Sequence, residues 1–126
     1  MNGRFLFIGF VGVFLVTSIF FITGGREPAI SSNPVEHVEI LLTADGFKPN
    51  EVWIKKGGSA TFRTDLTRPF WPASNLHPDH GIYRDFDPRR PLGPAESWSF
   101  TFDRVGDWGM HDHLRSYYVG TTHVLE

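Results

Sequence analysis

The stretch FKPNEVWIKKGGSATF, residues 47–62, carries the clearest fold signal in this chain. Its apolar residues recur at every second position, first at Val52 and Ile54 and then at Ala60 and Phe62. Residues two apart in an extended chain point to the same side, so this alternation predicts half-buried β-strand segments. Two adjacent glycines separate the segments, as is typical of a turn or break.

The same period-two alternation recurs in both directions from this stretch. It is found at residues 38–42, 97–102, 108–111 and 120–125, and no amphipathic helix longer than two turns interrupts it. Short alternating runs divided by turn residues are typical of all-β proteins. We therefore predict an antiparallel β-sandwich of about seven strands.

One long segment breaks the pattern. Residues 66–96 contain six prolines and little periodicity. Irregular connections of this length are uncommon in a small domain and are often functional.

The N-terminal residues are predicted to lie outside the folded domain. Phe5 to Ile22 is an uncharged, mainly apolar stretch of 18 residues, the lower limit for spanning a bilayer. We predict that residues 1–26 form an N-terminal transmembrane helix, with a cleaved signal segment as the alternative. Residues 27–35 are then a linker, and residues 36–126 are the domain.

Charge around the apolar stretch predicts its orientation. Arg4 and the amino terminus precede it, whereas Arg26 and Glu27 after it nearly cancel. The positive-inside tendency then places the domain on the extracytoplasmic side of the cell membrane as a single-pass protein. If the segment is cleaved, the domain is secreted or periplasmic.

Composition excludes several kinds of function. After position 26 the chain has 10 Lys and Arg against 14 acidic residues, a formal charge of −4, which predicts no nucleic-acid partner. The chain has no cysteine, so it has no disulfide, thiolate nucleophile or thiolate metal ligand.

Four of the six histidines occur in two short clusters. The first is His77-Pro78-Asp79-His80 and the second is His111-Asp112-His113. Imidazole is the commonest metal ligand in proteins, and it suits copper and zinc alike. His77, His80, His111 and His113 are therefore the predicted metal ligands. Asp112 and Asp79 are candidates to hold an imidazole through its other ring nitrogen.

The order of the motifs resembles a known family. Phe47–Phe62 is similar to the opening of bacterial cupredoxin domains, and Pro94–Trp108 is similar to their Pro-Gly-Glu-Ser and Gly-x-Tyr/Trp motifs. The similarity covers roughly residues 36–126. It implies a cupredoxin-like Greek-key β-sandwich and a copper cofactor.

The ligands of a blue-copper cupredoxin are not all present. The family's cysteine ligand aligns with Asp112, and a blue centre needs a thiolate. His77–Gly81 and Gly106–Leu114 instead resemble histidine motifs of multicopper oxidases. That resemblance implies that His80, His111 and His113 are similar to type 2 and type 3 copper ligands, and that His77 matches the type 1 histidine.

These observations predict a membrane-tethered, extracytoplasmic, cupredoxin-like protein. We expect paired histidines to bind one copper ion in a non-blue site that serves copper handling or redox chemistry, with zinc as the alternative metal. A redox protein or a copper-trafficking protein is the expected partner. The other functional hypotheses are a metal-free interaction module and a small copper oxidoreductase; the residues leave open whether the protein is an enzyme.

Overall fold

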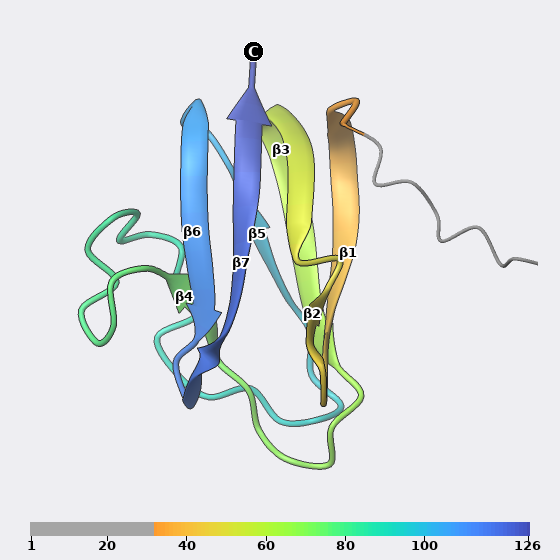
Figure 1. Ribbon diagram of the computed structural model, residues 1–126, viewed down its shortest axis with the longest axis vertical. Helices are drawn as coiled ribbons and strands as arrows, with labels where there is room; N and C mark the ends of the chain where they lie inside the picture. The colour runs from red at the N-terminus through yellow and green to blue at the C-terminus, as the bar shows by residue number, and fades with distance from the viewer. Residues whose placement is uncertain (1–31) are drawn as a thin grey trace, which may run out of the picture.

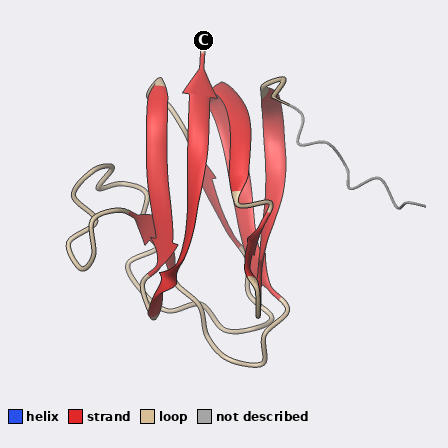
Figure 2. Ribbon diagram, in the orientation of Figure 1, coloured by secondary structure: helices blue, strands red, loops and turns tan. Residues whose placement is uncertain are grey.

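The computed structural model describes residues 32–126, which form an all-β domain (Figures 1 and 2). The predicted N-terminal anchor or signal segment lies outside the described residues. Within residues 32–126 no helix is long and apolar enough to cross a membrane. The strands are β1 (Val35–Thr43), β2 (Gly46–Lys48), β3 (Glu51–Thr64), β4 (Pro72–Ser74), β5 (Trp98–Thr101), β6 (Gly106–Asp112) and β7 (Arg115–Leu125).

β3 joins the two layers of the sandwich. Its first part, Glu51–Lys55, pairs with β7 and touches β1 only at Ile54, whereas its second part, Ser59–Thr64, pairs with β1 throughout. β5 also pairs with this second part and lies behind β7 in Figure 1. The path of paired strands runs β2-β1-β3-β7-β6-β4, so the longest strand contributes to both layers.

Strand direction differs from the prediction. β1 and β7 both run parallel to β3, whereas the β1–β2, β3–β5, β4–β6 and β6–β7 pairs are antiparallel. The prediction of a wholly antiparallel sheet is therefore wrong, and the sheet is mixed. Alternation reports only which side of a strand is buried, and a one-sided strand has the same pattern in either direction.

The glycine pair in the fold-deciding stretch marks the point where β3 changes layers. Gly57 has a positive φ of 84°, which favours glycine. A Cβ on Gly58 would lie only 2.8 Å from the backbone oxygens of Glu36 and Lys55. Backbone hydrogen bonds from Gly57 N to Phe102 O (2.7 Å) and from Phe102 N to Gly58 O (2.8 Å) hold the bend in place.

The core lies between the two layers and consists mainly of large apolar side chains. Burying one such side chain contributes roughly 1.5–3 kcal/mol to stability. The alternating residues of β3 that the sequence pattern pointed inward, Val52, Ile54, Ala60 and Phe62, are all buried. They pack with Ile40, Leu42, Phe47, Phe70, Tyr83, Phe86, Leu92, Phe102, Met110 and Val124.

The proline-rich connection between β4 and β5 is irregular but anchored to this core. Phe86 is fully buried, and its ring lies 5.0 Å from that of Phe100 and 5.5 Å from that of Phe62. Its carbonyl accepts a 2.9 Å hydrogen bond from the backbone of Ser74. The connection is thus fixed beside β4, which positions the side chains described next.

Candidate metal centre

The four clustered histidines come from two segments that β-pairing brings together. His77 and His80 follow β4, whereas His111 belongs to β6 and His113 lies just beyond its end. β4 pairs antiparallel with β6, with Ala73 opposite His111. The connection that carries the first two histidines therefore begins beside β6, next to which β4 lies in Figure 1.

The four imidazoles form a closed ring. Around it, the ring-centroid distances are 5.3 Å from His77 to His111, 5.2 Å from His111 to His80, 4.8 Å from His80 to His113 and 4.7 Å from His113 to His77. The His111–His113 diagonal is longer, at 6.2 Å. All four predicted ligands are therefore neighbours in one cluster.

The nitrogen atoms have separations that suit a shared metal ion. His77 Nδ1 lies 3.2 Å from His111 Nε2, and His80 Nε2 lies 2.8 Å from His113 Nδ1. With metal–nitrogen bonds of about 2.0 Å, two neighbouring ligands are roughly 2.8–3.3 Å apart. The potential ligand atoms of His77, His111 and His113 all lie within 4.8 Å of one another; His80 is not part of this group and adjoins it through His113. The donor set thus fits a late transition-metal ion.

A hydrogen bond to Asn75 orients His111. Asn75 Oδ1 lies 3.1 Å from His111 Nδ1 and can only accept, so Nδ1 carries the proton and Nε2 faces His77. Asn75 is itself held by a 3.0 Å backbone hydrogen bond to the carbonyl of Gly109. A Cβ on Gly109 would approach the Asn75 amide to 2.5 Å, so glycine there makes room for this side chain.

His80 is oriented by Asp87, from the same connection. His80 Nδ1 lies 2.7 Å from Asp87 Oδ2, and both side chains are nearly buried. The indole of Trp71 donates a 2.8 Å hydrogen bond to the other oxygen of this carboxylate. The Trp71 ring also packs 4.5 Å from that of His113, so it forms a wall of the cluster.

Burial and mutual repulsion keep parts of the cluster neutral. Burial, followed by the charges of the neighbouring imidazoles, lowers the pKa of His111 to about 4. The same causes lower the pKa of His113. Burial alone would raise the pKa of Asp87, but hydrogen bonds from His80, Trp71 and Arg89 hold it below its ordinary value. Because metals bind neutral imidazole, the depressed pKa of His111 favours metal binding at neutral pH.

The two aspartates within the histidine motifs do not support an imidazole through a hydrogen bond. Asp112 is fully buried and accepts 2.7 Å hydrogen bonds from the backbone of Trp71 and from Arg115 Nε. Asp79 is exposed and lies over Gly81. The structure gives the orienting role to Asp87 and Asn75 instead. Neither residue has a spacing signal in the sequence, and their only feature there is closeness to the first histidine motif: Asn75 is two residues before His77, and Asp87 is seven after His80.

The other two histidines lie outside the cluster. His37 is exposed on β1 and is hydrogen-bonded to Ser59 at 2.9 Å. His123 on β7 bridges two carboxylates, with Nδ1 2.6 Å from Asp107 and Nε2 2.9 Å from Glu51. Neither histidine is therefore available to the cluster.

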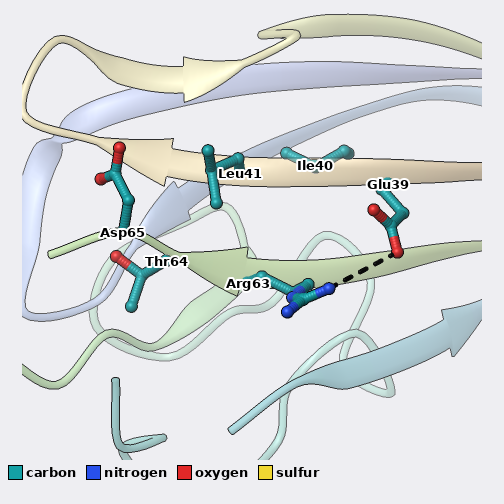
Figure 3. Close-up of a pocket in the computed structure, with 6 residues that line it drawn as sticks. All are labelled: Glu39, Ile40, Leu41, Arg63, Thr64 and Asp65. Carbon is teal, nitrogen blue, oxygen red and sulfur yellow. Dashed lines mark ion pairs between the residues drawn. The ribbon is translucent and has the colours of Figure 1, made fainter. Parts of the chain in front are cut away.

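A groove between β1 and β3 contains none of the four histidines. Figure 3 shows Glu39 and Arg63 pointing toward each other across it, with an N–O distance of 3.9 Å. Both side chains are more than half exposed, so this ion pair is screened by water and contributes little to stability. The groove offers no ligand set comparable to the histidine cluster.

No protein-family model matches the chain, and no curated protein matches it. Solved structures do. A novel purple cupredoxin from Nitrosopumilus maritimus has a TM-score of 0.61 and 18% identity over 70% of this chain and 99% of its own. A reduced Cu(I) form of an amicyanin mutant has a TM-score of 0.60 and 14% identity, over 75% of this chain and 94% of its own. A Cu-containing nitrite reductase from Thermus scotoductus SA-01 has a TM-score of 0.58 and 18% identity, over 80% of this chain and 28% of its own. The chain therefore has the cupredoxin fold, which confirms the resemblance seen in the sequence.

Proposed function

We propose that this protein binds a single copper ion through His77, His80, His111 and His113. The observation that carries the proposal is the closed ring of four imidazoles, in which neighbouring nitrogens lie 2.8 and 3.2 Å apart. Four histidines from two distant segments have no structural need to meet in this way, because imidazoles crowded together repel one another once protonated. A shared metal ion supplies the reason.

Copper is favoured over zinc by the fold and by the donor set. The structural neighbours named above include a Cu(I) amicyanin and a Cu-containing nitrite reductase. A ring of nitrogen donors suits Cu(II), which prefers square-planar or tetragonal surroundings. The absence of cysteine excludes the thiolate on which a blue centre depends. The proposed site is therefore a nitrogen-rich, non-blue copper site.

Copper titration of the full-length protein tests this proposal. We expect one Cu(II) per chain, with an electron paramagnetic resonance spectrum typical of nitrogen ligands and without intense blue colour. The His111→Ala/His113→Ala double variant should lose this binding and still fold. Binding weaker than the micromolar range in the wild type, or a double variant that binds as well as wild type, overturns the proposal. Competition with Zn(II) measures the metal preference.

We further propose a role in copper handling or redox chemistry at the extracytoplasmic face of a membrane. His77 is exposed whereas His111 and His80 are buried, so the cluster is open to solvent on one side. An open side permits transfer of the ion or of an electron to a partner protein. The uncharged stretch of residues 5–22 supports a membrane tether. Membrane fractionation with alkaline extraction tests the tether: release into the soluble fraction contradicts it.

A further inference from the structure

The carboxylate of Asp87 joins His80 of the histidine cluster to Trp71, which packs against His113. Its Oδ2 lies 2.7 Å from His80 Nδ1, and its Oδ1 accepts from Trp71 Nε1 at 2.8 Å. The side chains of His80 and Asp87 are only 5% and 10% exposed, so water competes weakly for this hydrogen bond. The contact joins residues that lie seven positions apart in an irregular loop.

Hydrogen-bond chemistry determines which nitrogen of His80 carries its proton. An ionised carboxylate can only accept, so the neutral imidazole must donate from Nδ1. Its Nε2 is then left with a lone pair directed at His113 Nδ1, 2.8 Å away. We propose that Asp87 is the positioning residue of this centre: it holds His80 with Nε2 facing the histidine cluster as a metal donor. This inference rests on the proposed copper site and assigns it a residue outside both histidine motifs.

Asp87 is itself held in place from several sides. The backbone N–H of Arg89 donates to Oδ1 at 2.7 Å, in addition to the Trp71 indole. The preceding residue, Phe86, is fully buried in the aromatic core. The carboxylate therefore has little freedom to turn away, and its orientation is passed on to the imidazole.

The backbone at His80 also points to a need for external support. His80 has a φ of 52°, in the left-handed region that non-glycine residues seldom occupy. Its N–H is hydrogen-bonded to the carbonyl of Leu76 at 2.6 Å. Such a conformation is kept only where surrounding contacts hold it, and the 2.7 Å hydrogen bond to Asp87 is such a contact.

Asp87→Asn is the informative change because it alters hydrogen bonding and charge but hardly alters size. The new amide can still accept from Trp71 through its oxygen, and its NH₂ group then faces His80 Nδ1. A donor at this position favours the tautomer with the proton on Nε2, the nitrogen that should bind the metal. Loss of a carboxylate that supports a ligating histidine typically weakens metal affinity by about 10- to 100-fold.

The experiment has two readouts on the full-length protein. Long-range ¹H–¹⁵N NMR of the metal-free protein reports the tautomer of His80, and Cu(II) titration reports the dissociation constant. We expect Nδ1–H in the wild type, Nε2–H in Asp87→Asn, and an affinity for Cu(II) about 10- to 100-fold weaker in that variant. Asp87→Glu keeps the acceptor, so it should restore Nδ1–H and recover part of the affinity.

Asp85→Asn is the matched control. It removes the same charge two positions away, where the carboxylate is 69% exposed and pairs with Arg104 at 3.3 Å. It should change neither the tautomer nor the affinity. If Asp87→Asn does not fold, the tautomer of His80 in the wild type and in Asp87→Glu still tests the inference. A proton on Nε2 of His80 in either protein overturns it.

The outcomes separate this inference from the proposed function. A wild type that binds no copper overturns the proposed function, whereas the tautomer in the metal-free protein still tests the role of Asp87 in orienting His80. A wild type that binds copper, with an Asp87→Asn variant that binds it equally well, overturns the inference and leaves the proposed copper site standing.

Discussion

Nδ1 of His77 lies 3.2 Å from Nε2 of His111, although 34 residues separate the two histidines in the chain. The contact exists because β4 pairs with β6 and the connection after β4 returns beside the end of β6. His77 is exposed and His111 is buried, so the pair joins the surface of the cluster to its interior.

Copper should stabilise the fold, and His77→Ala should remove that effect at little structural cost. A ligand at 100 times its dissociation constant stabilises a protein by about 2.7 kcal/mol, which should appear as a higher Tm for the wild type with Cu(II). His77 is exposed, so the metal-free variant should unfold within about 0.5 kcal/mol of wild type. Thermal unfolding with and without copper measures both, with His37→Ala as the control that keeps the copper effect.

Acid should destabilise the metal-free protein through His111. Its folded-state pKa of about 4 lies below the unfolded value of about 6.5, so the unfolded chain binds more protons between these values. Stability from this residue is therefore present above pH 6.5 and is lost as the pH falls toward 4, by an amount on the order of 2–3 kcal/mol. Denaturant unfolding at several pH values in this range measures the free energy of unfolding. This free energy should change less with pH in His111→Gln than in the wild type. An unchanged pH dependence contradicts the assignment.

His123 should contribute the opposite pH dependence. Burial alone would lower its pKa, but hydrogen bonds to Asp107 and Glu51 raise it above its ordinary value. Its stabilising effect is thus complete below pH 6.5 and is lost as the pH rises through the raised pKa. The side chains of Glu51 and Asp107 are 46% and 76% exposed, so water screens both ion pairs and limits the effect to less than about 1 kcal/mol. His123→Gln should remove this fall in stability, whereas His37→Gln should retain it.

Phe86→Ala should weaken both the fold and the metal site. Phe86 is fully buried and stacks 5.9 Å from Trp98, so its truncation should cost about 3–5 kcal/mol of unfolding free energy. The same change loosens Asp87, the next residue, so copper affinity should fall as well. Denaturant unfolding and Cu(II) titration measure the two effects. The control is Tyr117→Ala, a truncation of a 69% exposed aromatic residue, and equal losses in both variants would contradict the prediction.

Local patterns in the sequence determined much of the fold. The alternation at Val52, Ile54, Ala60 and Phe62 correctly predicted which side chains of β3 are buried, because the period of a strand is a property of the local backbone. The direction of pairing was predicted wrongly for β1 and β7 against β3. Direction depends on how the connections cross between layers, and no short window of sequence contains that information.

The site divides in the same way. Residue type and spacing by themselves marked the four histidines as candidate ligands, because imidazoles in two short clusters are a chemical signal that needs no fold to be seen. Only the tertiary structure decided which nitrogens face one another, and that Asp87 rather than Asp112 supports His80. The orientation of a buried imidazole is set by the nearest fixed acceptor in space, and folding of an irregular loop determines which residue that is.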